Sequence, residues 1–534
     1  MGETEGRVLG RVTVYSVLGC PHCVQAKTSL GRLGLPVCDV DMGKHPELRG
    51  SVKELTGRST VPQIFFNSVH IGGNDDLQEL LPEELERLVR LVREEPVLSE
   101  ALPLPKENQS DGSDTAEEAD GADAETMDQC YLIAPDQPAP GLSAQPQYVS
   151  LSSSLLCYHS EFKCERDALA DVVEELKRSG VIGFQWRGLS MCRNSFTGAQ
   201  LVGWLQKERG MEMTKACETG QMLLDRKYMV GVAGAGKGVG FGVSDRLYRL
   251  MERNPHSALN AGQTAACSPL QAAELSAILR DMILKLFSEY LSSDGKCVDY
   301  KAMSLSPVFE RYCELAVQLQ RVELLSLTRE EKLAFFINTY NALVIHGNVR
   351  MGAPTNMWQR YKFFNYVSYL IGGEVFTLQD IENGVLRGNR KGVAQLLRPF
   401  SKTDPRLQVA LPDAEPLIHF ALNCGAMGCP PIKTYTPQDI DSQLRTAAES
   451  FLENDDGCVV DSEKGEVRLS QIFKWYKADF GGTDEKLLNW ILEHMGESPK
   501  RSSLQSVLSS GKIKVSYLPY DWSTNSSQRQ SNKP

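Results

Sequence analysis

Two cysteines separated by two residues, Cys20-Pro21-His22-Cys23, form the pattern with the clearest chemistry in this sequence. The β-branched run before the motif favours a strand and Pro21 favours the first turn of a helix, so the motif is predicted at a strand-to-helix junction. A thiol at a helix N-terminus has a lowered pKa, because unpaired N–H groups and the helix dipole stabilise the thiolate. Cys20 is therefore predicted as the nucleophile, and Cys23 as the second thiol that expels a mixed disulfide.

The segment Thr60-Val61-Pro62 is a second candidate, because its proline opens a predicted strand. Proline has no N–H to donate to a strand ladder. If the peptide bond before Pro62 is cis, the backbone of Val61 is predicted beside the sulfur, where it can pair with the backbone of a substrate. Half of a zinc site is the alternative use of the cysteine motif. This region has no second cysteine pair at zinc spacing, so no metal site is predicted.

Strands and helices must alternate in residues 8–95 to position these groups. β-branched and apolar runs, ended by glycines, predict the order βαβαββα. The predicted strands are residues 11–16, 36–41, 63–66 and 69–71, and the predicted helices are residues 21–32, 45–56 and 76–93.

This segment resembles the glutaredoxins. The residues that carry the resemblance are the cysteine motif, Thr56-Gly57, Thr60-Val61-Pro62, and Gly72-Gly73 followed by Asp75-Asp76-Leu77. The resemblance implies an α/β thioredoxin-fold domain, glutathione as the cofactor, and thiol–disulfide oxidoreductase activity with Cys20 and Cys23 as catalytic residues. It also implies that Thr60, Val61 and Pro62 bind the cysteinyl part of glutathione, and that Gly73, Asp75 and Asp76 bind its γ-glutamyl end.

Two positions differ from the usual glutaredoxin pattern. Val17 stands where glutaredoxins usually carry a lysine, three residues before the first cysteine. Ser59 stands where many carry an arginine, and Arg58 lies one residue earlier. The loss of charge-assisted contacts is expected to weaken glutathione binding.

The charge of the chain is concentrated in one segment. The 534 residues carry a net charge of −11, and residues 107–128 hold nine acidic residues and no basic one. The near-neutral remainder argues against nucleic-acid binding, which needs a basic excess. Residues 96–160 are predicted to be an acidic disordered linker. The chain opens without a secretory signal and has no long apolar run, and its scattered cysteines are typical of reduced thiols, so a cytoplasmic protein is expected.

Residues 161–255 resemble DEP domains, the small modules found in several signalling regulators. The resemblance is carried by residues 194–198, 201–205, 220–224 and 241–245. It implies an α+β winged-helix-like fold, docking to membrane lipid or to receptors, and a place in intracellular signal transduction. Arg178, Arg187 and Arg193 could form a basic face for anionic lipid, and a plain solvated surface is the alternative.

Residues 270–525 resemble an uncharacterised family, domain of unknown function 547, and a mainly helical α+β domain is expected. The resemblance is carried by residues 336–346, 419–431 and 517–522, and residues 526–534 are predicted to be a disordered tail. Cys424 and Cys429 with two histidines and an asparagine could form a thiol-hydrolase site. The residues considered for that site are His346, His419, Asn338 and Asn341. The alternative is that the asparagines cap buried backbone and the cysteines pack around a turn.

The sequence as a whole predicts a glutathione-linked thiol–disulfide oxidoreductase coupled to an intracellular signalling adaptor. Its expected substrates are glutathionylated or disulfide-containing proteins. Two alternatives stay open. One is a non-catalytic signalling scaffold with an inert glutaredoxin fold, and the other is cysteine hydrolase activity in the C-terminal domain.

Overall fold

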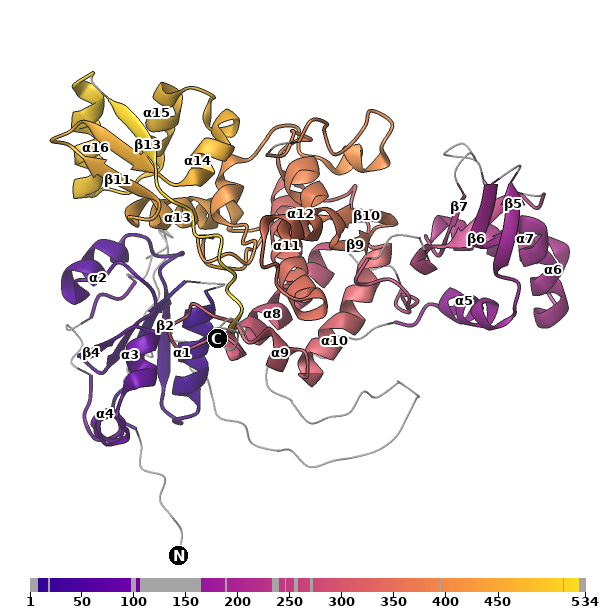
Figure 1. Ribbon diagram of the computed structural model, residues 1–534. Helices are drawn as coiled ribbons and strands as arrows, with labels where there is room; N and C mark the ends of the chain where they lie inside the picture. The colour runs from indigo at the N-terminus through magenta and orange to yellow at the C-terminus, as the bar shows by residue number, and fades with distance from the viewer. Residues whose placement is uncertain are drawn as a thin grey trace, which may run out of the picture. The chain divides into compact units, whose positions relative to one another are not determined.

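The computed structural model describes most of the chain outside the acidic linker (Figure 1). The described residues are 8–17, 20–97, 102–105, 165–187, 190–232, 240–244, 246–253, 258–268, 272–393, 395–511 and 513–527. The linker predicted at 96–160 and the tail predicted at 526–534 therefore lie almost entirely outside the described residues. The chain forms two compact units, one holding the N-terminal domain and the other holding the middle and C-terminal domains.

The N-terminal domain is built on a mixed four-stranded sheet with the order β2-β1-β3-β4. Strand β1 (Val12–Ser16) pairs in parallel with β2 (Val37–Asp41) and antiparallel with β3 (Gln63–Phe66), which pairs with β4 (Val69–Gly72). The side chains of each strand alternate between two apolar cores, one on either face. Helices α1 (Pro21–Gly31), α3 (Asn74–Glu79) and α4 (Pro82–Glu94) cover one face, and α2 (Leu48–Thr56) covers the other.

The predicted single helix at 76–93 is wrong, because the chain makes two helices there. Leu80 and Leu81 adopt extended backbone angles, and Pro82 begins α4. Proline is tolerated at the first position of a helix but breaks a helix that precedes it. The apolar spacing continues across the break, and this continuity concealed it in the sequence.

The N-terminal domain does not end at residue 95. The hydroxyl of Tyr15 donates to the carbonyl oxygen of Pro103 at 2.9 Å. Leu102 is buried and Leu104 is partly buried in the same core as Tyr15 and Val17. Residues 102–105 therefore belong to the domain, in contrast to their predicted place in the linker.

The middle domain is α+β, as predicted, with an antiparallel sheet in the order β5-β6-β8-β7. Its elements are α5 (Ala168–Arg178), β5 (Gly183–Arg187), β6 (Ser190–Thr197), α6 (Gly198–Arg209), α7 (Met213–Asp225), β7 (Met229–Gly231) and β8 (Leu247–Leu250). A capping box opens α6, since the N–H of Gln200 donates to Thr197 Oγ1 at 3.1 Å and the N–H of Thr197 to Gln200 Oε1 at 2.8 Å. The resemblance to DEP domains stays a prediction.

A buried ion pair joins the middle and C-terminal domains within one unit. Asp167 caps α5 by accepting the N–H of Leu169 and also accepts from Arg321 Nη2 at 2.6 Å. The guanidinium of Arg321 lies 3.8 Å from the ring centre of Tyr228.

Cys267 is disulfide-bonded, which differs from the reduced thiols expected from the sequence. Spacing along the chain cannot show which thiols the fold brings together.

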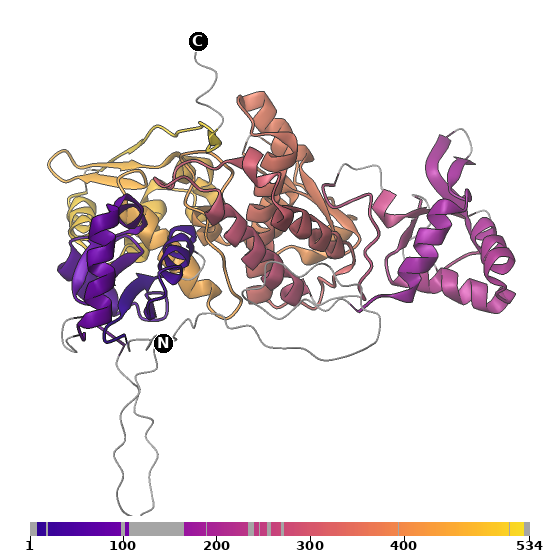
Figure 2. The ribbon, with the colours of Figure 1, turned by 90° about the horizontal axis from the view of Figure 1, so that it is seen from below.

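The C-terminal domain is mainly helical (Figures 1 and 2). Its helices are α8 (Ala272–Glu289), α9 (Tyr300–Met303), α10 (Pro307–Ala316), α11 (Arg329–Met351), α12 (Met357–Tyr366), α13 (Ile440–Glu453), α14 (Gln471–Trp475), α15 (Asp484–His494) and α16 (Pro499–Ser509). Helix α11 is buried from Leu333 to Asn348, and a side chain at its Gly347 would collide with Phe363 of α12. Residues 436–439 form a turn before α13.

Two small sheets complete the C-terminal domain. Strands β9 (Ser368–Ile371) and β10 (Glu374–Thr377) form a hairpin that leads into a π-helical segment, η3 (Asp380–Leu386). Strands β11 (Cys458–Asp461) and β12 (Glu466–Leu469) form a second hairpin, and β13 (Lys514–Tyr517) joins β12 in parallel. Among the described residues, no helix has the length and apolar character needed to cross a bilayer.

Candidate functional site

Cys20 lies at the predicted strand-to-helix junction. It is the N-cap residue of α1, with extended backbone angles (φ −86°, ψ 119°), and Pro21 is the first helical residue. The N–H of Val24 donates to the carbonyl oxygen of Cys20 at 3.0 Å and closes the first turn. The sulfur is therefore beside the unpaired N–H groups of the first helical turn, which favour negative charge.

Cys23 differs from Cys20 in its electrostatic surroundings. Burial, together with a side-chain hydrogen bond to Cys20, raises the pKa of Cys23 well above its ordinary value. Cys23 therefore keeps its proton and donates a hydrogen bond toward Cys20. Lys27, one turn further along α1, opposes part of this shift and forms an ion pair with Asp39 at 2.6 Å. Sequence reasoning missed Lys27, although its i+4 spacing from Cys23 was a usable signal.

Thr60, Val61 and Pro62 lie at the end of the sheet where β1 leads toward α1. The Val61–Pro62 peptide bond is cis. Gln63 follows directly, opposite Tyr15 in the β1–β3 register, and its Nε2 donates to the carbonyl oxygen of Thr60 at 2.8 Å. Thr60 is exposed, Val61 is half-buried and Pro62 is buried. The first two residues of this turn therefore face solvent.

Gly73, Asp75 and Asp76 open helix α3 next to that turn. A Cβ on Gly73 would lie 3.4 Å from the carbonyl oxygen of Pro62, and so the two segments are adjacent. Asn74 Nδ2 donates to Gln25 Oε1 at 2.8 Å, which ties the start of α3 to α1. The structure thus brings the two predicted glutathione segments together beside the helix that carries the cysteines. Asp75 is exposed on the first turn of α3.

Asp76 is paired with Arg58. Arg58 Nη1 lies 2.5 Å from Asp76 Oδ2, and the N–H of Gly73 donates to the same oxygen at 2.7 Å. The hydrogen bond from Arg58 lowers the pKa of Asp76, against a smaller opposing effect of burial. The arginine displaced by one residue in the sequence therefore contacts the predicted glutathione segment, a pairing that sequence spacing did not reveal.

Position 17 is buried and offers no exposed site for a charged side chain. The side chain of Val17 is buried in the core that holds Tyr15, Cys38 and Phe65. The lysine that is missing from the usual pattern is therefore replaced here by an apolar core residue. The cations that the structure gives to this end of the domain are Arg58 and Lys27.

The C-terminal hydrolase constellation does not come together. Asn338 exchanges two hydrogen bonds with the backbone of Tyr435, at 2.8 and 3.0 Å. Asn341 donates to the carbonyl oxygen of Ala421 at 3.0 Å and accepts the N–H of Asn423 at 2.9 Å. The alternative that these asparagines cap buried backbone is confirmed, and neither orients a histidine through these bonds.

Both histidines of that constellation are engaged elsewhere. His346 is buried, and its Nδ1 lies 2.7 Å from the hydroxyl oxygen of Tyr369. His419 Nε2 lies 2.9 Å from Asp479 Oδ2. Within the ranges that the structure describes, no hydrogen bond joins either histidine to Cys424 or Cys429. The cysteines instead contact each other, with 3.1 Å between their sulfur atoms.

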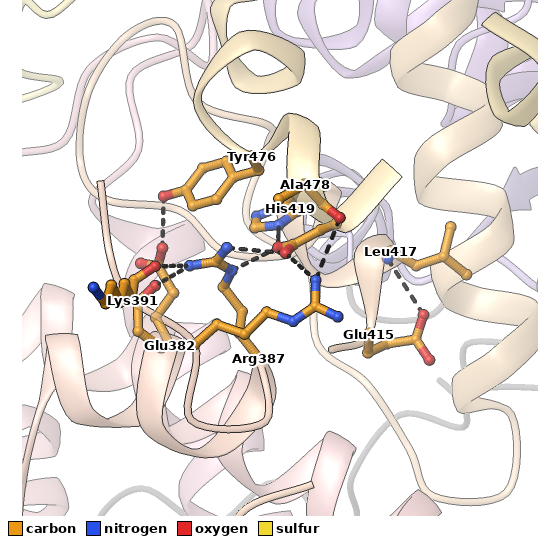
Figure 3. Close-up of polar contacts among 11 residues, drawn as sticks. Glu382, Arg387, Lys391, Glu415, Leu417, His419, Tyr476 and Ala478 are labelled. Carbon is orange, nitrogen blue, oxygen red and sulfur yellow. Dashed lines mark hydrogen bonds and ion pairs between the residues drawn. The ribbon is translucent and has the colours of Figure 1, made fainter. Parts of the chain in front are cut away.

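A buried charge cluster surrounds His419 (Figure 3). The carboxylate of Asp479 accepts from Arg387 Nε at 2.6 Å, from Arg387 Nη2 at 2.9 Å and from Arg390 Nη1 at 2.8 Å. Although burial raises it, hydrogen bonds from His419 and Arg387 hold the pKa of Asp479 well below its usual range. Burial lowers the pKa of His419. The cluster joins three segments that are distant in sequence. Each of these charged groups contacts another residue of the cluster.

The described residues contain no group of three or more histidine, cysteine or acidic side chains that could hold a metal ion.

Comparison with known proteins divides the chain in the same way. Residues 12–71 match the model of the family described as Glutaredoxin, and residues 324–452 match that of "Protein of unknown function, DUF547". A glutaredoxin of Pseudomonas aeruginosa is 39% identical over 69 residues, which cover 13% of this chain and 82% of the relative. Glutaredoxin-1 of Saccharomyces cerevisiae is 38% identical over 96 residues, covering 16% of this chain and 83% of the relative.

A solved structure is also similar in sequence to part of this chain. The solution structure of glutaredoxin from Brucella melitensis is 41% identical, covers 17% of this chain and 95% of that chain, and has a TM-score of 0.15. The relatives are thus covered over most of their own length by a small part of this chain. The chain belongs to the glutaredoxin family through its N-terminal domain.

Proposed function

We propose that the N-terminal domain is a glutathione-dependent thiol–disulfide oxidoreductase acting on glutathionylated or disulfide-containing proteins. The observation that carries this proposal is the position of Cys20 at the N-cap of α1 with Cys23 as its hydrogen-bond donor. A cytoplasmic compartment rich in reduced glutathione would supply the electrons.

The chemistry requires two exchange steps. The thiolate of Cys20 attacks the glutathione sulfur of a mixed disulfide, forms a Cys20–glutathione disulfide and releases the substrate thiol, which takes up a proton. A second glutathione then attacks the glutathione sulfur of this intermediate, forms glutathione disulfide and returns Cys20 to the thiolate. With a protein disulfide as substrate, Cys23 instead attacks the sulfur of Cys20, forms a Cys20–Cys23 disulfide and releases the reduced protein. Two glutathione molecules then reduce the Cys20–Cys23 disulfide and leave as glutathione disulfide.

Glutathione binding is the finer part of the proposal. Its γ-glutamyl end carries both an ammonium and a carboxylate. The exposed pair of Asp76 and Arg58 offers one charge of each sign within a single contact. The solvent-facing backbone of Thr60 and Val61 supports pairing with the cysteinyl part.

The full-length chain tests the proposal when it is given a glutathionylated peptide, reduced glutathione and a coupled assay for glutathione disulfide. We expect turnover that saturates with glutathione. A rate equal to that of the uncatalysed exchange would contradict the proposal and favour the inert scaffold.

Replacing Asp76 by asparagine should raise the KM for glutathione about five-fold and leave kcat nearly unchanged. The variant loses the charge that faces the ligand ammonium, and about 1 kcal/mol of binding corresponds to this factor. Glu84→Gln is the matched control, because Glu84 pairs with Arg87 on the exposed side of α4. An unchanged KM in Asp76→Asn would place the γ-glutamyl end elsewhere.

We further propose that the β5–β6 hairpin docks the chain on anionic membrane, as a signalling adaptor would. Phe184 and Trp186 are 66% and 70% exposed on β5. Trp186 lies opposite the exposed Met191 in the antiparallel register, and the exposed Arg193 lies two residues further on the same face. Large apolar side chains beside a cation suit the boundary between lipid tails and anionic headgroups. Arg178 is exposed at the end of α5, and the side chain of Arg187 lies outside the described residues.

Replacing Trp186 by serine should weaken binding of the full chain to phosphatidylserine-containing vesicles by about ten-fold, the loss expected when one large aromatic side chain leaves the interface. Trp358→Ser is the control, because Trp358 is 64% exposed on α12, outside the hairpin. Co-sedimentation with vesicles made with and without phosphatidylserine provides the measurement. Equal loss in both variants, or binding to neither vesicle, would refute docking through the hairpin.

A further inference from the structure

Two cysteines of the C-terminal domain lie in direct contact. The sulfur atoms of Cys424 and Cys429 are 3.1 Å apart, both residues are in the thiol form, and both are half-buried. This distance is short enough that a bond between the sulfurs needs only a small side-chain rotation. The activity proposed for the N-terminal domain does not use this pair, and the two histidines that the hydrolase hypothesis needs contact Tyr369 and Asp479 instead.

The loop between the two cysteines is held at both ends by one side chain. Asn423 Oδ1 accepts the N–H of Gly425 at 2.8 Å, and Asn423 Nδ2 donates to the carbonyl oxygen of Pro430 at 2.7 Å. Gly425 has a positive φ of 79°, which a residue with a side chain would adopt only under strain. The loop is therefore built to keep residues 424 and 429 together.

The C-terminal segment of the chain fixes the same loop from outside. The N–H of Met427 donates to the carbonyl oxygen of Ser523 at 2.8 Å, and that of Gly428 to Asp521 at 2.9 Å. This segment brings the hydroxyl of Tyr520 to 3.3 Å from the sulfur of Cys429. A residue 91 positions away in sequence thus belongs to the immediate surroundings of the pair.

The two sulfurs are not equivalent. Cys429 accepts the N–H of Cys424 at 3.2 Å, and a hydrogen bond from the thiol of Cys424 lowers the pKa of Cys429 against burial, with a further contribution from Tyr520. The same hydrogen bond to Cys429, together with burial, raises the pKa of Cys424 well above its usual value. One thiol is thereby prepared to attack and the other to resolve, the division of labour that thiol–disulfide exchange requires.

We propose that Cys424 and Cys429 form a second redox-active dithiol of this chain, which cycles to a disulfide by exchange with a low-molecular-weight disulfide. The thiolate of Cys429 attacks one sulfur of the disulfide, forms a mixed disulfide and releases one thiolate. Cys424 loses its proton, attacks the sulfur of Cys429 and releases the second thiolate. Two electrons pass from the dithiol to the disulfide, and the two protons end on the two released thiols.

The full-length chain with Cys20→Ser and Cys23→Ser, which silence the N-terminal dithiol, provides the test. The protein is equilibrated with mixtures of reduced glutathione and glutathione disulfide, quenched in acid, alkylated and digested with trypsin. Cys424 and Cys429 fall in one tryptic peptide, between Arg406 and Lys433. A disulfide between them therefore lowers the mass of that peptide by two hydrogens.

We expect both cysteines to lose alkylation together in one two-electron transition. Cys424→Ser should trap glutathione on Cys429, and Cys429→Ser should abolish the internal disulfide. Cys313, an equally half-buried thiol whose sulfur lies 3.6 Å from His346 Nε2, is the internal control and should stay alkylated across the transition. The proposal would be overturned if Cys424 and Cys429 stayed alkylated at ratios of reduced glutathione to glutathione disulfide that oxidise Cys20 and Cys23 in the wild-type chain. Independent mixed disulfides on Cys424 and Cys429 would also overturn it.

Tyr520→Phe separates this chemistry from mere packing. The variant keeps the ring and removes the hydroxyl that contacts Cys429. We expect the pH profile for alkylation of Cys429 to move to higher pH, and the disulfide still to form. An unchanged pH profile in this variant would show that Tyr520 does not act on Cys429. If Cys429 of the wild-type chain were unreactive at all pH values, the proposed nucleophile would be wrong.

Discussion

Serine at position 20 should abolish glutathione-dependent turnover by the full chain, with a loss of about 10³-fold or more, as is typical when a covalent nucleophile is removed. A serine hydroxyl at the N-cap of α1 stays protonated at neutral pH, and so the first exchange step has no attacking thiolate. The coupled assay with a glutathionylated peptide measures this loss. Residual turnover above about one tenth of the wild-type rate would show that another thiol attacks the substrate.

Cys23→Ser is the matched variant, because it changes the neighbouring sulfur and keeps the nucleophile. It should retain turnover of the glutathionylated peptide, in which glutathione resolves the intermediate, and lose most of its activity on a protein disulfide, which needs the second thiol. The ratio of the two activities therefore separates the roles of the two cysteines. Equal losses on both substrates would show that Cys23 supports Cys20 structurally and does not resolve an intermediate.

The buried carboxylate of Asp479 should be the position at which a single substitution destabilises the C-terminal domain most. Asp479→Ala leaves Arg387 without its charge partner and His419 without its hydrogen bond, and the loss of one partner from a buried ion pair costs about 3–5 kcal/mol. Urea unfolding of the full chain, followed by tryptophan fluorescence, measures it. Trp490 reports directly, because its ring packs against Phe480 beside the cluster.

Arg390→Ala is the control for that measurement. Arg390 contacts the same carboxylate, but its side chain is 41% exposed, so its removal should cost less than about 1 kcal/mol. Replacing Arg387 and Asp479 together by leucine should recover part of the loss, since no uncompensated charge is then left in the interior. If Asp479→Ala lowered the free energy of unfolding by less than Arg390→Ala does, water would reach the carboxylate and the cluster would not hold the three segments together.

Local patterns in the sequence predicted most of the N-terminal domain. The order of strands and helices and the helix start at Cys20 depend on neighbouring residues, and both are confirmed except for the break at Pro82. Contacts between distant residues were not predictable in this way. Arg58 meets Asp76 only because β3, β4 and α3 fold back, and no spacing rule links the two.

The C-terminal domain shows the same division more strongly. The amides of Asn338 and Asn341 can serve a backbone cap or a catalytic residue with the same atoms, so the sequence left both readings open. The contacts of His419 with Asp479 and of Cys429 with Tyr520 join residues 60 and 91 positions apart. Which of these polar groups meet depends on how distant segments pack, and no local sequence pattern records that.

The packing of residues 102–105 on the N-terminal domain sets the point from which the acidic linker departs. Leu102 and Leu104 occupy the core that also contains Val17, three residues before the nucleophile. A fragment cut at residue 95 would lose Leu102 and Leu104 and would expose part of the core that contains Tyr15 and Val17. The sequence-based boundary is thus a poor place to truncate, and a fragment extending to residue 105 keeps the native surroundings of the cysteine motif.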